Sequence, residues 1–163
     1  MLNPHELLAM TTTWTELDFD QLSWHDNAVH GLQIIEGQHG CGDIVLDLDY
    51  ILEWQGRDGR FHFSVAPATL TFHEASSLKI TIDYGASSAA LTPFAIHQIG
   101  FESVAYSNGA TGRRWKIEIN WPNGEIVFEA PRFTQILTGK PMNSTRQSLS
   151  QSERERLKIS PGP

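Results

Sequence analysis

The sequence contains a single cysteine, Cys41, among its 163 residues. One cysteine cannot form a disulfide within the chain, and it cannot supply the several thiolates of a thiol-based zinc site. A domain of this length buries about 70% of its unfolded surface, so it needs neither kind of crosslink to fold. The cysteine content favours a reducing compartment, and we expect a cytoplasmic protein of bacterial type.

Long hydrophobic runs are also missing. No stretch of about 18 apolar residues occurs, so we expect no membrane-spanning helix and no membrane partner. Residues 1–10 lack a basic segment followed by an apolar run, and therefore do not resemble a signal peptide. Asn3 followed by Pro4 is typical of a helix start and predicts a short helix over residues 4–9. If the natural start is Met10 instead, this helix belongs to an extension.

Basic residues are scarce in the first third of the chain. Residues 1–60 hold eleven acidic residues and only two basic ones, Arg57 and Arg60, whereas residues 61–163 hold eight acidic and ten basic residues. Nucleic acid binding requires clustered lysine and arginine, so we expect no nucleic acid partner. The asymmetry favours a partner with a basic surface, although ordinary solubilising charge gives the same pattern.

Strong catalytic and nucleotide-binding motifs are absent as well. The sequence has no glycine-rich phosphate loop, no Gly-x-Ser-x-Gly nucleophile motif and no His-Glu-x-x-His metal motif. We therefore expect no cofactor and no bound metal. The sequence leans away from an enzyme without deciding the question.

The sequence does contain a strong hydrophobic period of two. Over residues 43–54 the even positions are apolar and most of the intervening positions are acidic, which is typical of a half-buried β-strand. A turn over residues 55–60 separates this run from a second alternating run, so residues 43–65 predict a β-hairpin. Pro67 is expected to break the returning strand or to mark a sheet edge.

Similar alternation continues along the chain. It slips in phase near His97–Gln98, which predicts a β-bulge, and Asn123-Gly124 is a strong hairpin signal. Because the connections are too short for helical crossovers, we predict an all-β fold. It would be an antiparallel β-sandwich or open barrel of roughly eight strands with short terminal helices. The further strands are expected near residues 28–35, 78–84, 94–106, 115–121 and 126–128.

The composition changes after Gly139. We expect one β domain over residues 1–139 and a polar, partly ordered C-terminal tail over residues 140–163. Ser150 and Glu153 have the spacing of a helix capping box, which predicts a short helix ending near Leu157.

The densest group of chemically versatile residues is Trp24, His25, Asp26 and His30. Asp26 and His30 share one face of an extended chain, so a carboxylate and an imidazole there could bind a metal or transfer a proton. The structural alternative is that Asp26 or Asn27 closes a turn, Trp24 fills the core and His30 is a hydrogen-bonded core histidine. We take these four residues as the candidate functional cluster.

Two other sets of residues are weaker candidates. His62, His73 and His97 lie in separate predicted strands, and folding could gather them into a zinc site. Asp47 and Asp49 face the same side of a predicted strand, as a pair of acid–base carboxylates would. The same spacing is also the ordinary pattern of a solvated strand face.

Tryptophan residues offer a third kind of candidate. Trp54, Trp115 and Trp121 could line a binding surface, because tryptophan is enriched where proteins bind one another. Their spacing of two beside isoleucine and leucine favours the core instead.

The segment 22–32, Leu-Ser-Trp-His-Asp-Asn-Ala-Val-His-Gly-Leu, carries a family resemblance. It resembles the opening of a loose group of small uncharacterised bacterial proteins in which a His-Asp pair leads into the first strand. A strand that alternates apolar and acidic residues follows there, as it does at 44–54 here. Some members of the group are regarded as immunity proteins of polymorphic toxin systems. The resemblance covers residues 22–54 and places His25 and Asp26 at the matching positions, without giving them a role.

Three functional hypotheses follow. The first is a non-enzymatic protein-binding or immunity-type domain that covers a basic partner surface with the acidic stretch 16–58. The second is a small-ligand- or metal-binding β-barrel enzyme whose mouth is lined by His25, Asp26, His30 and either His62 or His73. The third is a homo-oligomer held together by an exposed strand edge.

Overall fold

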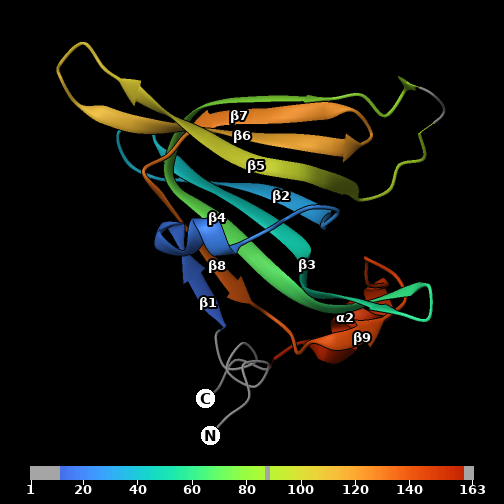
Figure 1. Cartoon of the computed structure of the whole chain (residues 1–163). Coiled ribbons are helices and arrows are strands. Elements are labelled where there is room, and N and C mark those ends of the chain that lie inside the picture. The colour runs from blue at the N-terminus through green and yellow to red at the C-terminus, as the bar shows by residue number, and fades with distance from the viewer. Residues whose placement is uncertain (1–11, 87–88, 160–163) are drawn as a thin grey trace, which may run out of the picture.

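The structure is a computed structural model that describes residues 12–86 and 89–159 (Figure 1). It is mostly antiparallel strand, which confirms the predicted all-β fold. The helix predicted for residues 4–9 lies outside the described residues. The elements are β1 (Thr13–Thr15), η1 (a 3-10 helix, Glu16–Gln21), β2 (Ala28–Glu36), β3 (Gly42–Arg57), β4 (Arg60–Ile82), β5 (Phe94–Ala105), β6 (Thr111–Trp121), β7 (Gly124–Glu129), β8 (Arg132–Leu137), β9 (Met142–Ser144) and α2 (Gln151–Leu157).

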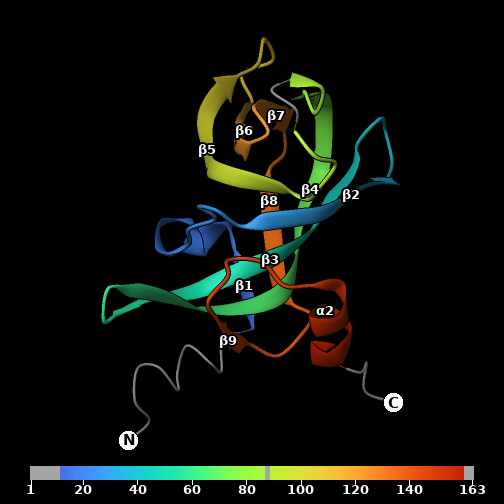
Figure 2. The same ribbon diagram turned by 90° about the vertical axis from the view of Figure 1, so that its right-hand side faces the viewer.

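The strands form one sheet in the order β1-β8-β4-β3-β2-β5-β6-β7, with β9 paired to β4. β4 also pairs with β7, and this pairing closes β4, β3, β2, β5, β6 and β7 into a ring (Figure 2). Alternating apolar side chains point into the curled sheet and form the main core. Phe72 lies at its centre, with ring centroids 4.6 Å from Phe128 and 5.1 Å from Trp115. The chain thus buries its apolar face by curling the sheet on itself.

The long strand β4 bends, and this bend lets it pair with β3 along its first part and with β7 along its last part, which closes the ring. Its first part pairs with β3 and β8, and its last part pairs with β7. Between them Glu74 and Ser77 have φ of 53° and 55°, and the register shifts between Ser76 and Lys79. Such bulges bend a strand and increase its twist. A register shift between Ile96 and Gln98 in β5 confirms the bulge predicted there.

The prediction that Pro67 breaks a strand or marks an edge is wrong. Pro67 lies inside β4, opposite Asp49 of β3. Its carbonyl oxygen accepts a hydrogen bond from the Thr138 backbone N–H at 2.8 Å, just beyond the end of β8. The backbone nitrogen of Pro67 therefore faces the junction between β8 and β9, where the ladder is interrupted and no donor is needed.

The described part of the predicted tail has regular structure. Ser150 caps α2, and the predicted capping box with Glu153 is confirmed, as is the end of the helix at Leu157. β9 pairs with β4, and Leu149 is buried in a second, smaller apolar cluster that includes Phe63. Residues 140–159 therefore pack against the outside of the β3–β4 hairpin (Figure 2). Among the described residues, no helix has the length and apolar content to cross a membrane.

Candidate functional site

Trp24 is a core residue. It is 3% exposed, and its indole Nε1–H donates to the side-chain carbonyl of Gln135 at 2.7 Å. The ring also packs against Phe19 and Phe133, with centroids 5.9 and 5.8 Å away. Trp24 therefore fills the core, as the structural alternative for this residue predicted, and its polar group is satisfied.

His30 contacts a buried carboxylate on the neighbouring strand. The β2–β3 register shifts between Val29 and Gly31, and His30 lies at this irregularity with Nε2 2.7 Å from Asp49 Oδ2. A carboxylate only accepts hydrogen bonds, so Nε2 carries the proton. His30 is half-buried and hydrogen-bonded, which agrees with the structural alternative for this residue.

Asp49 is the centre of a buried ionic cluster. Its side chain is fully buried, so the interpretation of this strand face as solvated is wrong for Asp49. That interpretation is confirmed for Asp47, whose side chain is 52% exposed. The Leu149 backbone N–H donates to Asp49 at 2.8 Å, and the Arg154 guanidinium from α2 binds both Asp49 and Asp47. Each oxygen of Asp49 therefore has a donor. This carboxylate fastens the C-terminal segment to β3, and it does not face substrate-sized space.

Asp26 closes a turn before β2 and joins two other segments. Its φ of 62° is in the left-handed region, which aspartate tolerates in turns. Its carboxylate accepts from the Asn120 side chain at 2.6 Å and from the Gln147 side chain at 2.9 Å. Asp26 and His30 thus bind different partners and do not act as the predicted carboxylate–imidazole pair.

His25 is the one member of the predicted cluster on the surface. Its Nδ1–H donates to the backbone carbonyl of His97 at 3.0 Å, because a carbonyl can only accept. The His25 ring is 47% exposed, and it stacks on Trp54 with a centroid distance of 6.1 Å. The His97 ring lies 5.5 Å away, edge-on.

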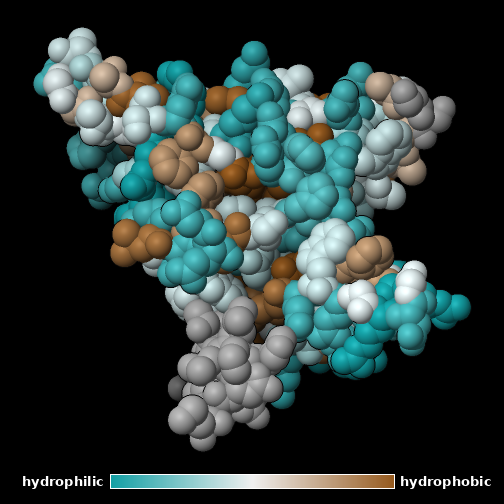
Figure 3. All heavy atoms as spheres, viewed as in Figure 1, coloured by the Kyte–Doolittle hydropathy of each residue, from teal (hydrophilic) through white to brown (hydrophobic). Residues whose placement is uncertain are grey.

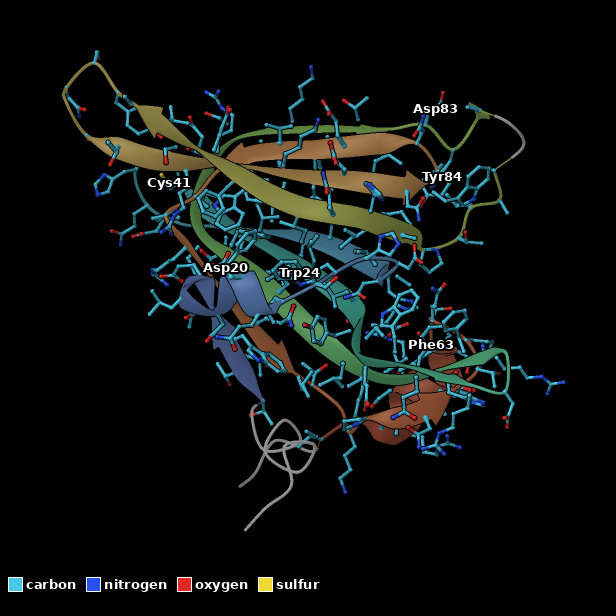
Figure 4. The ribbon with its side chains drawn as sticks, in the orientation of Figure 1. Asp20, Trp24, Cys41, Phe63, Asp83 and Tyr84 are labelled. Atoms are coloured by element: carbon cyan, nitrogen blue, oxygen red, sulfur yellow. The ribbon has the colours of Figure 1, made fainter. Side chains whose placement is uncertain are left out.

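These residues form part of an exposed aromatic surface, which we call the hairpin patch: His25, Trp54, Phe61 and His97. Trp54 and Phe61 come from opposite strands of the β3–β4 hairpin and are 44% and 62% exposed. Their ring centroids are 6.4 Å apart, and the buried ring of Phe63 packs beneath Trp54 at 5.0 Å. Figure 4 shows Phe63 at the base of this hairpin, and Figure 1 shows the hairpin extending away from the ring.

The position of Trp54 was not predictable from alternation alone. Its even position suggested a core residue, as did the spacing of Trp121, which is 51% exposed; only Trp115 of these three is buried. The β3–β4 register shifts between Ile51 and Glu53, so Trp54 no longer shares the phase of Leu48. In Figure 3 the outline of the molecule narrows at the right, between β5–β6 above and the hairpin below.

The acidic stretch 16–58 does not form one continuous free surface. The carboxylates of Asp26, Asp43, Asp47 and Asp49 all accept hydrogen bonds or ion pairs from the rest of the domain. Exposed acids of this stretch include Asp20, Glu36 and Asp58, which lie on η1, on the end of β2 and at the hairpin tip. Part of the acidic charge of this stretch is therefore paired within the domain, and among these four carboxylates Asp49 alone is fully buried.

The remaining histidines do not form a ligand set. Within residues 12–86 and 89–159, no group of three or more His, Cys, Asp or Glu side chains is placed to hold a metal ion. His62 lies opposite Gln55 in the hairpin, and His97 lies against His25 in the hairpin patch. The second hypothesis, an enzyme with a mouth lined by His25, Asp26, His30 and His62 or His73, therefore lacks its predicted ligand cluster.

His73 forms an arrangement that sequence analysis missed. Its Nδ1 lies 3.3 Å from Asp43 Oδ2, and its Nε2 lies 2.9 Å from the Thr134 hydroxyl. An acid, an imidazole and a hydroxyl in this order resemble an activated nucleophile. However, Thr134 pairs with Thr15 on one side and Thr71 on the other, in the middle of the sheet. The flanking backbone groups are used by the ladder and leave no oxyanion hole beside the hydroxyl.

Comparison of the chain with protein-family models, curated proteins and solved structures found no match to any of them. The hairpin patch is an exposed aromatic surface, and it differs in chemistry from the hydrogen-bonded surroundings of Asp26 and His30.

Proposed function

We propose that this protein is a non-enzymatic protein-binding domain and that the hairpin patch is its contact surface. The observation that supports this most directly is the exposure of Trp54 and Phe61 side by side on an extended hairpin. Tryptophan and other large aromatic side chains contribute most of the binding energy in many protein interfaces. Soluble domains seldom leave such residues together in water without a partner.

The patch is preorganised for binding. Trp54 packs against both the His25 ring and the buried Phe63 ring, and these contacts restrict its rotamer before a partner arrives. Restricting a side chain in the free protein removes about 0.5–1.5 kcal/mol of entropic cost from binding. Arg57 and Arg60 are exposed at the base of the hairpin turn and can supply hydrogen bonds at the rim of an interface.

The proposed partner has a basic surface. The net charge of the chain is −7, which attracts a basic protein over several ångströms before contact. The exposed acids on η1, β2 and the hairpin tip contribute to this field, while the aromatic patch supplies the contact energy. An immunity-type role, in which the domain covers and blocks a basic toxin, is the specific form of this proposal.

The test compares three baits, each first checked by thermal melting to be folded. Wild-type protein, a Trp54→Ala/Phe61→Ala variant and a Leu17→Ala control would be used to enrich partners from the host, and each captured protein would then be purified. Leu17 is 86% exposed but lies on η1, away from the hairpin. We expect a basic protein that binds wild type and the control equally and the double variant at least about 30-fold more weakly.

Growth measurements extend the same comparison. If the captured protein is toxic when expressed alone, wild type and the Leu17→Ala control should restore growth and the double variant should not. Equal binding by the double variant would refute the hairpin patch as the contact surface. If the partner binds the hairpin patch but is not toxic, the protein-binding function stands and the immunity role is refuted.

A further inference from the structure

β2 has one side without a strand partner over most of its length. On one side β2 pairs with β3 from Val29 to Glu36, but on the other it pairs with β5 only at Ala28 and Val29. Among the described residues, no strand covers the second side of Gly31–Glu36, a segment that we call the free edge. Unpaired edges of this kind bind strands from other chains readily.

The backbone groups of the free edge are directed outward at alternate residues. Gly37 donates its backbone N–H to Cys41, so Gly37 faces β3, and in an antiparallel pair every second residue does the same. Ile35 and Gln33 therefore also face β3. The N–H and C=O groups of the three intervening residues face away from it: Leu32, Ile34 and Glu36.

The free edge also lacks the features that protect most edge strands. Ile34 is 62% exposed and Ile35 is 46% exposed, and the segment contains no lysine and no proline. By contrast, β1 and β9 are only three residues long. Ile34 borders a groove of about 390 Å³ whose walls include Ile44, Ala75 and Leu78.

We propose that the free edge binds the free edge of a second copy of this chain, which makes a two-fold antiparallel dimer. With Ile34 opposite Ile34 of the second copy, all three outward-facing residues are in register to exchange backbone hydrogen bonds. In that register Glu36 lies opposite Leu32, so no acidic residue faces its own copy. The exposed Ile34 side chains meet at the two-fold axis, where each covers the other.

The proposed dimer leaves the hairpin patch accessible. Figure 4 shows Cys41, which follows the free edge, at the opposite end of the molecule from Phe63 at the base of the hairpin. A dimer would therefore carry two hairpin patches facing outward. The dimer does not rest on the proposed partner-binding function, and either proposal can fail without the other.

Multi-angle light scattering and sedimentation equilibrium test the dimer in the full chain. We expect the mass of wild type to rise with concentration from 18.3 kDa toward twice that value. Ile34→Lys brings two lysines together at the axis and should weaken the dimer at least about tenfold. The matched control is Ile136→Lys, since Ile136 is 45% exposed but its strand β8 has partners on both sides.

Crosslinking tests the register itself. In a Cys41→Ser background, Ile34→Cys places one cysteine on each side of the two-fold axis. Their Cα atoms would be about 5.5 Å apart, which is within the range for a disulfide. Ile34→Cys should give a covalent dimer under mild oxidation, and Glu36→Cys should not. A wild type that stays monomeric at all concentrations, or a dimer that survives Ile34→Lys, would refute the proposal. The proposal would also be refuted if wild type is a monomer that binds a different protein and Ile34→Lys abolishes that binding. The free edge would then be the binding site for that protein.

Discussion

At the residue scale, the buried ion pair of Asp49 and Arg154 links α2 to β3. Arg154 is the cation that compensates Asp49 inside the protein, and its side chain is only 7% exposed. We predict that Arg154→Leu lowers the free energy of unfolding by about 3–5 kcal/mol, because it leaves a buried carboxylate without its charge partner. Arg156→Leu, on the exposed side of the same helix, should change it by less than about 0.5 kcal/mol. Urea denaturation measures both.

A double replacement tests whether the uncompensated charge causes this loss. Asp49→Leu combined with Arg154→Leu removes both charges, so it should recover much of the stability that Arg154→Leu alone loses. If the double variant is no more stable than the single one, removing the uncompensated charge gains less than it costs to leave the Leu149 N–H and His30 without their acceptor.

Glu153 gives a prediction about pH. The Ser150 backbone N–H donates to its carboxylate at 2.7 Å and lowers the pKa of Glu153 from its ordinary value, partly opposed by desolvation. A lowered pKa in the folded state means that the ionised group stabilises the fold above the unfolded pKa and that this contribution is lost as the pH falls through the folded pKa. Glu153→Gln should therefore be less stable than wild type at neutral pH, and melting curves of the two should converge on acidification.

Local sequence predicts some of the residue positions correctly. Trp24 in the core, Asp26 in a turn and the Ser150–Glu153 cap follow from a few neighbouring residues, and all three are confirmed. The partnership of Asp49 with Arg154 joins residues 105 positions apart and leaves no local pattern. Sequence alone therefore placed Asp49 on a solvated face, where only its neighbour Asp47 is exposed.

At the element scale, the β3–β4 hairpin depends on a tight turn. Asp58 and Gly59 form it, with φ of 50° and 71°, as expected for a two-residue type I′ turn. We predict that Gly59→Ala costs about 1–2 kcal/mol of stability through backbone strain alone, because a Cβ there meets no neighbouring atom. Gly56→Ala is the control, since its added Cβ is equally free and its φ is not in the left-handed region. Equal effects in thermal melts would contradict this explanation.

Hydrophobic alternation predicted where most of the strands lie, but it did not predict that β4 continues as one strand from Arg60 to Ile82. The hairpin over 43–65, the strand at 28–35 and the bulge in β5 are confirmed because each is determined by local period and turn chemistry. β4 runs from Arg60 to Ile82 through Pro67 and two positive-φ residues, since its neighbours change along its length. That change is a property of the whole sheet, and no local pattern encodes it.

At the scale of the whole molecule, net charge should act in opposite directions on the two proposed associations. Two copies of a chain with charge −7 repel each other, so the dimer should strengthen when salt is raised from about 50 to 500 mM. Binding of a basic partner is assisted by the same charge and should weaken over that range. Sedimentation and binding measurements across the salt series check both signs. A dimer that weakens with salt would indicate ion pairs in the interface in place of strand pairing.

The buried Asp49–Arg154 pair between β3 and α2 also has a consequence for folding during synthesis. Asp49 leaves the ribosome about a hundred residues before Arg154. Until that arginine emerges, the nascent sheet holds an acidic group that it cannot enclose without neutralising it. We expect a polypeptide truncated before Arg154 to keep this defect and to be degraded more readily than the full chain, so that the Asp49–Arg154 pair distinguishes finished molecules from unfinished ones.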